Sequence, residues 1–491
     1  MAPAKSLTTL VIDPGAYTLK AGFAPSDPTT PPNPTDCHVI PNCIARGRDK
    51  RVYIGSQLEK CTDFGEMAFR RPVEKGYIVN WEAERAIWER ELLGERAGLK
   101  CDPHTTHLIL AEPSNSPAAL QTNNDQIIFE EFEFASYHRA LSPQLAAWND
   151  IPSLFTPTST STAASDPTTT TEMDTTPDVS TPQPNLSSLP AEILLLIDTS
   201  HSSTTITPLL RGQPIHSSVR RLPLGGKHLS AYLAELISLR HISLIDEPHL
   251  VSQIKHDVSF VSGSAAAFAA NLDASWHFSR KTGKGKGEGI VVDYVLPDYE
   301  RLHRGFTRPH DGSHAARMAK LGLGSGTQTT DPSATGAATV EKENAAEDVI
   351  TLTNERFSPA ELLFNPPDIG LQALGIPALV FAVLDTLPRS LWPGLLANIV
   401  VVGGNSLIPG LVERVESEVR MLAPAEMAVR VARPLRPDIA VWEGGARFAQ
   451  AQVKGKVGVS REEYLEHGAL WTARRMRELG REMGGKGAGA E

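Results

Sequence analysis

Two segments of the chain share one order of apolar and polar positions. The first, TTLVIDPGAYTLKAGF at residues 8–23, is an apolar run that ends in an aspartate, followed by a turn of small residues and an alternating segment. The second, EILLLIDTSHSSTTITPL at residues 192–209, has the same parts, and its Asp198 lies 185 residues after Asp13. Each predicts a strand, a tight turn and a returning strand, with a carboxylate at the end of the first strand. Two unrelated hairpins would give the same pattern, so an internal repeat needs further support.

A third apolar segment, near the end of the chain, combines a strand pattern with a helix pattern. Residues 397–422, ANIVVVGGNSLIPGLVERVESEVRML, predict a buried strand, a turn at Gly403 and Gly404, and a helix with one apolar face. Glycines at such a turn let a ligand approach the backbone, and the start of a helix offers N–H donors. Residues 225–240 predict another amphipathic helix, which we interpret as packing on the core. The apolar positions of the 397–422 helix are Leu411, Val415, Val419 and Leu422.

Segments of low hydrophobicity divide the chain into two blocks. From Ile151 to Leu189, 24 of 39 residues are Ser, Thr or Pro and none is Lys or Arg. So little apolar surface cannot offset the entropy of ordering, and we predict a disordered insertion over 151–189. The predicted lobes are 1–150, with a reduced small subdomain at about 46–76, and 190–475, which ends by returning to the first lobe. Flexible insertions are predicted at about 280–289 and 311–346, and a flexible tail at 476–491.

Composition and charge describe a folded, acidic protein. Of the 491 residues, 41% are hydrophobic and 21% are charged, which is typical of globular proteins. The 47 Lys and Arg residues against 57 Asp and Glu residues give a net charge of −10, so the chain as a whole does not attract polyanions. The apolar run at 371–387 is interrupted by Pro377 and Asp385, and we predict neither a signal peptide nor a membrane span.

The cysteines are few and contain no C-x-x-C pair, which favours free thiols in a reducing compartment over a disulfide framework. A zinc site at Cys101, His104 and His107 is the alternative, and it lacks a fourth ligand nearby. The four cysteines are Cys37, Cys43, Cys61 and Cys101.

One local segment is basic. Between residues 280 and 310 there are 7 Lys and Arg residues against 4 acidic residues, a local charge of +3 that could contact DNA phosphates. A solvated loop is the simpler interpretation, because RKTGKGKGEG has no interleaved aromatic residues. The candidate DNA contacts are Arg280, Lys281, Lys284 and Lys286.

Taken together, two carboxylate hairpins and a strand, Gly-Gly and helix unit resemble the clamp of the actin and sugar-kinase superfamily. The segments KGYIVNW, VVDYVLPDYERLHRGF, ERFSPAELLFNP, VVGGNSLIPG and VWEGG narrow the resemblance to one branch of the nuclear actin-related proteins, of the fungal type with low-complexity insertions. The resemblance covers nearly everything outside the insertions. It implies an α/β, actin-like fold: two lobes of duplicated ribonuclease-H-like mixed sheets, flanked by helices, around a nucleotide cleft.

The resemblance also implies a nucleotide cleft that takes ATP or ADP with Mg²⁺. The alternative interpretation is that Asp13 and Asp198 only cap their strand turns and that Lys20 pairs with one of them across the cleft. The residues that match the nucleotide-binding positions of the family are Asp13, Gly15, Lys20, Asp198, Thr199, Gly403, Gly404 and Asn405.

Several positions depart from the family pattern in ways that disfavour hydrolysis. Tyr17 falls where the first phosphate loop has a glycine, and residues 200–202, Ser-His-Ser, replace Gly-Asp-Gly in the second loop. Ser142 aligns with the glutamine that orients the attacking water, and Gln144 lies about 200° further around a helix, so it cannot substitute. At the base and ribose end, His256 stands in place of an acid and Asp438 in place of a lysine. We expect no catalytic residues, and nucleotide binding stays open.

The function implied by the resemblance is that of a scaffold. The family role is that of a nuclear, non-catalytic subunit of a SWR-type chromatin remodeller, which exchanges nucleosomal H2A for the H2A.Z variant and so supports transcription regulation. The implied partners are the remodeller ATPase and a zinc-finger HIT-type subunit, with DNA reached through the complex. The nucleus is the expected location, with the cytoplasm as a second. No membrane contact is expected, since no membrane span is predicted. No homopolymer is expected, because the region 46–76 is shorter than in actin and the insertion at 151–189 would obstruct stacking. The alternatives are an autonomous actin-like ATPase and a protein that binds DNA or the nucleosome directly.

Overall fold

Two six-stranded sheets form the centre of the computed structural model, which describes residues 7–94, 98–156, 189–277, 289–310, 348–451 and 458–485. The first sheet has the order β20-β10-β9-β1-β2-β3, and the second has the order β13-β12-β11-β18-β19 with β14 paired to β12. The strands of the first are β1 (Thr8–Pro14), β2 (Thr18–Phe23), β3 (His38–Pro41), β9 (Thr106–Glu112), β10 (Ser136–Leu141) and β20 (Val459–Ser460). Those of the second are β11 (Ile193–Thr199), β12 (Thr204–Leu210), β13 (Gln213–Pro214), β14 (Arg220–Leu222), β18 (Ile399–Val402) and β19 (Val431–Ala432).

The two sheets are built in the same order, so the internal repeat predicted from the hydrophobic pattern is confirmed. In each, the carboxylate-bearing strand, β1 or β11, pairs antiparallel with the strand that follows it. On its other edge it pairs in parallel with a strand from much later in the chain, β9 or β18. Asp13 lies opposite Lys20 in one hairpin and Asp198 opposite Thr205 in the other. The α/β class with two lobes of duplicated mixed sheets is likewise confirmed.

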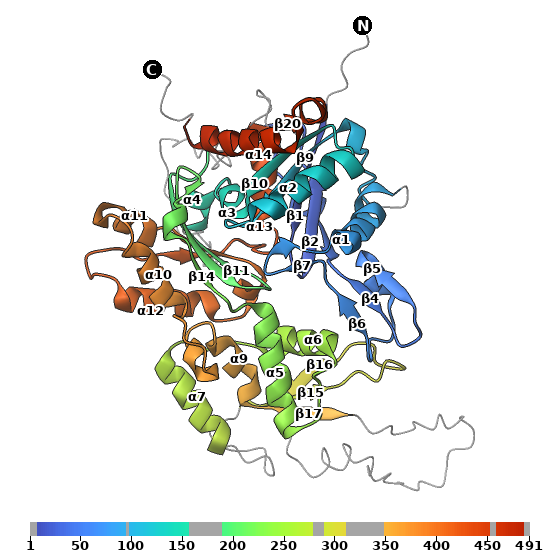
Figure 1. The fold of residues 1–491 in the computed structure, drawn as a ribbon. Coiled ribbons are helices and arrows are strands. Elements are labelled where there is room, and N and C mark those ends of the chain that lie inside the picture. The colour runs from blue at the N-terminus through green and yellow to red at the C-terminus, as the bar shows by residue number, and fades with distance from the viewer. Residues whose placement is uncertain are drawn as a thin grey trace, which may run out of the picture.

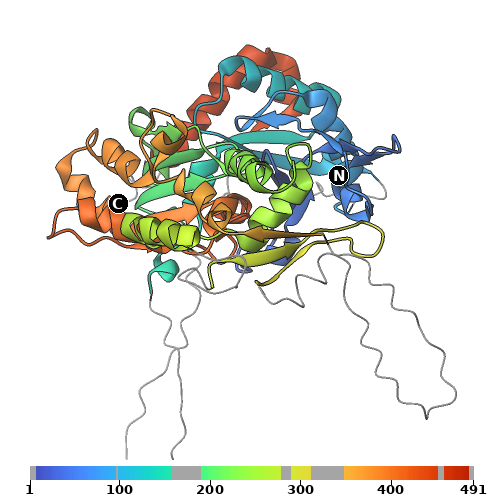
Figure 2. The ribbon, with the colours of Figure 1, turned by 90° about the horizontal axis from the view of Figure 1, so that it is seen from below.

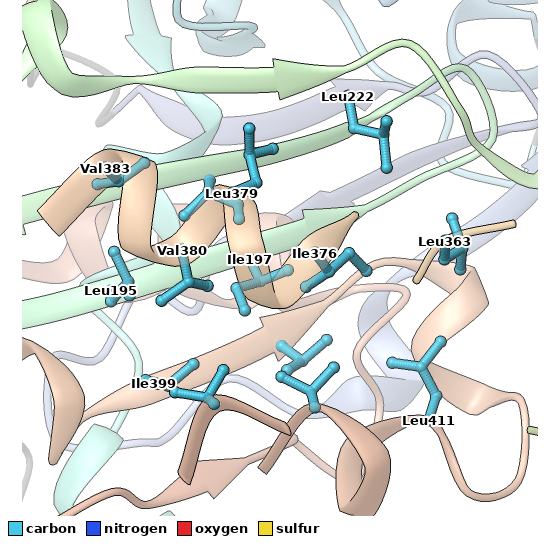
Figure 3. Close-up of a cluster of buried hydrophobic side chains, with 14 of the residues drawn as sticks. Leu195, Ile197, Leu222, Leu363, Ile376, Leu379, Val380, Val383, Ile399 and Leu411 are labelled. Carbon is cyan, nitrogen blue, oxygen red and sulfur yellow. The ribbon is translucent and has the colours of Figure 1, made fainter. Parts of the chain in front are cut away.

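Helices cover the faces of both sheets. The second sheet packs on α10, whose Ile376, Val380 and Val383 are fully buried, and Figure 3 shows these side chains lying over Leu195 and Ile197 of β11. The helices are α1 (Trp81–Trp88), α2 (Ala118–Gln126), α3 (Ser142–Ala146), α4 (Ile151–Leu154), α5 (Gly226–Arg240), α6 (Pro248–Val258), α7 (Ala265–His277), α9 (Ser358–Glu361), α10 (Ile376–Leu384), α11 (Trp392–Leu396), α12 (Leu411–Leu422), α13 (Ala440–Ala451) and α14 (Arg461–Gly485).

The end of the chain returns to the first lobe. Helix α13 packs on β1 and α3, and β20 adds an edge strand to the first sheet beside β10. Trp442 of α13 is fully buried, and its Nε1 donates a hydrogen bond to the carbonyl oxygen of Gly22 at 3.3 Å. Helix α14 bends at Gly468, which has a φ of 77°. It continues to Gly485, through much of the segment predicted as a tail.

Smaller sheets complete each lobe. In Figure 1 the β4–β6 sheet lies on the right, beside α6 of the other lobe, and β15–β17 lie below the second sheet with α5. Figure 2, seen from below, shows the second lobe's orange helices on one side and the first lobe's blue strands on the other. The bounds are β4 (Ile44–Arg46), β5 (Val52–Ile54), β6 (Ala68–Arg70), β7 (Val73–Glu74), β8 (Tyr77–Ile78), β15 (Val292–Val295), β16 (Phe306–Pro309) and β17 (Val349–Leu352).

The 397–422 segment folds as predicted, with one correction. Strand β18 is buried, and Leu411, Val415 and Val419 face the core of the second lobe. Leu422, predicted on the same face, is 54% exposed at the last position of α12.

The predicted insertions fall mainly outside the described residues. Ile151 is buried in the short helix α4, and residues 157–188 of the Ser/Thr/Pro-rich segment are outside the described ranges. The same holds for most of 280–289 and for 311–346. No helix in the described part of the chain is both long and apolar enough to span a bilayer.

Candidate functional site

The turns of the two carboxylate hairpins face each other across a cavity of about 120 Å³. Asp13, Gly15 and Ala16 contribute from the first turn, and Asp198 with residues 200–203 contributes from the second. Each carboxylate lies at the C-terminal end of the first strand of its hairpin. Because the two lobes repeat the same fold, these two strand ends meet at the cavity and bring the two carboxylates to it. The other lining residues are Pro14, Lys75, Gly76, Tyr77, Ala111, Pro113, Ser114, Asn115, Ser142, Pro143, Thr205 and Arg221.

Each carboxylate has a partner from its own hairpin. Lys20 Nζ lies 3.8 Å from Asp13 Oδ2, and Ser200 Oγ donates a hydrogen bond of 2.5 Å to Asp198 Oδ1. Burial raises the pKa of Asp198 to about 6, although the hydrogen bond from Ser200 lowers it in part. Burial also raises the pKa of Asp13, against the opposing effect of Lys20. Lys20 pairs with a carboxylate, as the turn-capping interpretation expected, but it does so within its own hairpin and not across the cleft.

Two aromatic side chains, one from each turn, meet between the hairpins. The ring centroids of Tyr17 and His201 are 5.1 Å apart, with planes tilted by 42°. Tyr17 Oη lies 3.1 Å from Ser252 Oγ on α6, so this side chain spans the two lobes. Arg71 lies with its guanidinium 4.6 Å from the Tyr17 ring centroid and donates hydrogen bonds to the carbonyl oxygens of Ala16 and Tyr17. The glycine position of the family is thus filled by a side chain packed on both lobes.

The second turn is fixed by hydrogen bonds from the rest of its lobe. The backbone N–H groups of Gly226 and Lys227, at the start of α5, donate to the carbonyl oxygens of Ser200 and His201. Asn405 Nδ2 donates to Ser200 O at 2.9 Å and lies 3.3 Å from Thr199 Oγ1. Donors that a helix start could offer to a phosphate are therefore used within the protein.

The structure explains why position 403 is a glycine, but it does not require a glycine at position 404. Gly403 has a φ of 91°, and a Cβ at this position would lie 2.4 Å from the carbonyl oxygen of Thr199. The close approach of β18 to β11 therefore explains this glycine without a ligand. A Cβ at Gly404 would have no atom within 4 Å, so this position is open.

The position expected for a water-orienting group holds a serine with another partner. Ser142 lines the cavity, and its Oγ donates to the carbonyl oxygen of Glu112 at 3.1 Å. Gln144 is buried at 4% exposure and is not among the cavity-lining residues. At the base and ribose end, His256 is an exposed side chain beside Asp257, and Asp438 is paired with Arg436.

The cleft does not fit a nucleotide polyphosphate in this arrangement. Pockets that bury small organic ligands measure about 300–1,000 Å³, and the cavity is well below that range. His201 lines the cavity and packs against Tyr17, and Lys20 Nζ lies 3.8 Å from Asp13 Oδ2. The eight candidate residues do come together around the two turns, and their role toward a nucleotide stays a prediction.

Sequence reasoning missed several residues that complete the cleft. Arg221 Nη2 donates to the carbonyl oxygen of Lys75 at 2.7 Å, which joins the second lobe to the turn between β7 and β8. Phe64 stacks on His249 with ring centroids 3.9 Å apart and planes 8° from parallel. Partners so distant along the chain leave no signal in local hydrophobic periodicity, and only the Lys75 segment carried one, through the KGYIVNW motif.

The neutral form of His249 is part of this cross-lobe contact, which leads to a prediction. Partial burial lowers the pKa of His249 from 6.5 to about 4, so folding displaces its proton. Stability contributed in this way is complete above pH 6.5 and is lost as the pH falls toward 4. We expect His249→Phe, which keeps a ring on Phe64, to lose less stability than the parent chain between pH 7 and pH 4.5, as measured by the urea midpoint.

His277→Phe is the matched control, because His277 is 67% exposed at the end of α7. Its pH profile should follow that of the parent chain. Equal acid sensitivity of the His249→Phe variant would show that the contact does not depend on a neutral imidazole.

The other candidate sites lie elsewhere. The proposed DNA contacts Arg280, Lys281, Lys284 and Lys286 are outside the described residues. Of the described basic residues in that segment, Arg304 pairs with Asp257 at 2.9 Å. All four cysteines are free, as predicted, and all are buried. For the zinc alternative, no group of three ligand-type side chains is assembled within the described ranges, and His107 Nδ1 lies 2.6 Å from Ser136 Oγ.

Comparison with known proteins places this geometry in a family context. The family model described as Actin matches residues 4–477. The chain is 45% identical to actin-related protein 6 of Neurospora crassa, over 96% of this chain and 95% of that protein. It is 42% identical to actin-like protein arp6 of Aspergillus fumigatus, over 95% and 94%. It is 30% identical to actin-related protein 6 of Drosophila melanogaster, over 94% and 97%.

Proposed function

This chain belongs to the actin family, within the actin-related protein 6 branch, and we propose that it acts as a non-catalytic scaffold subunit. The observation that carries the proposal is the state of the catalytic position. Ser142 stands where the family places its water-orienting glutamine, and its hydroxyl group is already bonded to Glu112 O. Since oriented water and charge stabilisation supply most of the catalysis in such sites, their loss leaves a clamp without turnover.

The resemblance of the sequence to the nuclear actin-related proteins supports a proposal for the assembly in which this scaffold acts. We propose a SWR-type chromatin remodeller in the nucleus, in which the subunit supports exchange of nucleosomal H2A for H2A.Z. The remodeller ATPase and a zinc-finger HIT-type subunit are the proposed partners. The contacts that join the two lobes without a ligand suit a structural role.

Affinity purification of the tagged chain from nuclei, followed by mass spectrometry, tests the assembly. We expect the remodeller ATPase and the zinc-finger subunit to copurify in amounts comparable to the tagged chain. A protein that runs as a free monomer in nuclear extract would contradict the proposal. DNA binding by the isolated protein, lost on neutralising Arg280, Lys281, Lys284 and Lys286, would support the direct nucleosome-binding alternative instead.

Phosphate release provides the second prediction and tests the absence of turnover. The purified chain with Mg²⁺ and ATP should release phosphate at the background rate, and Asp198→Ala should leave that rate unchanged. Asp246→Ala is the control, since Asp246 is an exposed carboxylate near the end of the loop between α5 and α6. Phosphate release above background that disappears only in Asp198→Ala would establish the autonomous ATPase alternative.

A further inference from the structure

We propose that the cleft is closed by the protein's own side chains, with Tyr17 and His201 filling the space between the hairpin turns, and that it therefore excludes nucleotide polyphosphates. This inference concerns the chain itself and holds whichever assembly the protein joins. In a nucleotide-clamped protein, phosphates and their cation join the two lobes. In this chain the two lobes are joined instead by aromatic, hydroxyl and guanidinium groups.

The inner contact lies between the two phosphate-loop turns. Tyr17 comes from the turn between β1 and β2, and His201 comes from the turn between β11 and β12. Their rings touch at a centroid distance of 5.1 Å, and Tyr17 Oη reaches Ser252 Oγ on α6 at 3.1 Å. The Arg71 guanidinium covers the Tyr17 ring, a cation–π contact that adds to the packing. A polyphosphate between the turns would have to displace both rings.

The second turn has little freedom to move aside. Its carbonyl oxygens at Ser200 and His201 accept hydrogen bonds from the first two N–H groups of α5. Asn405 Nδ2 also donates to the carbonyl oxygen of Ser200, and Ser200 Oγ donates to Asp198 Oδ1. Opening the turn breaks these bonds in a buried setting, where unpaired polar groups are costly.

An outer contact closes the cleft at the small subdomain. The Phe64 ring stacks on His249 at 3.9 Å, and the backbone N–H of Glu66 donates to Glu247 Oε1 at 2.9 Å. On the other side of the cavity, Arg221 bonds the carbonyl oxygen of Lys75. The lobes are thus joined by three sets of contacts that need no ligand.

What remains between the contacts is small. The cavity of about 120 Å³ is lined by the carboxylates Asp13 and Asp198 and by the cations Lys75 and Arg221, and Lys20 Nζ lies 3.8 Å from Asp13 Oδ2. Pockets that bury small organic ligands measure about 300–1,000 Å³, so a triphosphate is excluded by its size.

The test uses the full-length chain and two readouts. The first is the nucleotide released on denaturation of the purified protein, and the second is the melting temperature with and without millimolar ATP and Mg²⁺. The parent chain should carry less than a tenth of an equivalent of nucleotide, and its melting temperature should not change with ATP. A variant with Tyr17→Gly, Ser200→Gly, His201→Asp and Ser202→Gly should bind ATP at least 100-fold more tightly and melt several degrees higher in its presence.

Tyr17→Phe is the matched control, because it keeps the ring and loses only the hydroxyl contact to Ser252. It should behave like the parent chain toward ATP. One equivalent of bound nucleotide in the parent chain, or stabilisation of the parent chain by ATP, would overturn the proposal even if the variant failed to fold. A folded variant that binds ATP no better than the parent would also overturn it, because the two rings would then not be the obstacle.

Discussion

Replacing Trp442 by alanine should lower the free energy of unfolding by about 3–5 kcal/mol, the range for removing a fully buried aromatic side chain. Trp442 has no exposed surface and packs in a cluster that α13 shares with β1, β9 and α3. A Cβ added at Gly22 would lie 2.8 Å from the indole ring, which shows how closely the ring approaches β2. Little room exists for neighbouring atoms to fill the cavity that alanine would leave.

The indole has a second role that alanine also removes. Its Nε1 donates to the carbonyl oxygen of Gly22, a residue 420 positions earlier in the chain. Trp442→Phe keeps most of the apolar surface and removes this donor, so it should cost about 0.5–1.5 kcal/mol plus the lost ring volume. The order of stability should therefore be parent, Trp442→Phe, Trp442→Ala in urea unfolding followed by circular dichroism.

Trp276→Ala supplies the matched control, since Trp276 on α7 is 76% exposed. Its urea midpoint should stay close to that of the parent chain. If Trp442→Ala unfolded at the same urea concentration as Trp276→Ala, the return of α13 to the first lobe would not stabilise the fold, and the core described for that lobe would be wrong.

The local parts of the fold could be predicted because their signals are contained in short segments. An apolar run ending in Asp13 or Asp198, with a turn directly after it, specifies a hairpin within about 16 residues. The strand and helix around Gly403 were predictable for the same reason. The order of strands in each sheet could be predicted only with the help of the internal repeat, because β9 and β18 pair with β1 and β11 from far along the chain.

The candidate site was predictable in its residues and only partly in its contacts. The sequence placed Tyr17 and His201 in the two turns, and it indicated that Tyr17 restricts the approach of a phosphate. It could not indicate that they pack on each other, since that contact depends on how the lobes are joined. The Phe64 and His249 stack was missed for the same reason. The exposure of Leu422 was missed because hydrophobic periodicity does not mark the residue at which a helix ends.

Removing the Arg414 guanidinium should destabilise the second lobe by about 3–5 kcal/mol, because it would leave a buried carboxylate without its partner. Arg414 on α12 is 1% exposed, and its Nη2 donates to Glu361 Oε1 at 3.0 Å. Its Nη1 donates to the carbonyl oxygen of Ser262 at 2.7 Å, and Nε donates to Glu418. The guanidinium also lies 4.8 Å from the ring centroid of Phe364. Arg414→Met keeps the apolar stem and removes all of these polar contacts.

The double variant Arg414→Met with Glu361→Gln separates the loss of the ion pair from the cost of leaving the Glu361 carboxylate buried and charged without a partner. Glutamine at 361 carries no charge to leave unpaired, so the double variant should be more stable than the sum of the two single losses implies. Arg474→Met is the matched control, because Arg474 is 68% exposed in a surface pair with Glu478, and such pairs contribute little. Its unfolding free energy should be nearly unchanged.

The pH dependence of Arg414→Met provides a check with a definite sign. Burial raises the pKa of Glu361, and Arg414 opposes that rise. Without the guanidinium the pKa of Glu361 should rise further, so the folded state would hold a proton that the unfolded state releases. Stability of the variant would then fall as the pH rises. Its deficit against the parent chain should be larger at pH 8 than at pH 5.5, and a deficit that is constant or grows in acid would show that Glu361 is not the stranded charge.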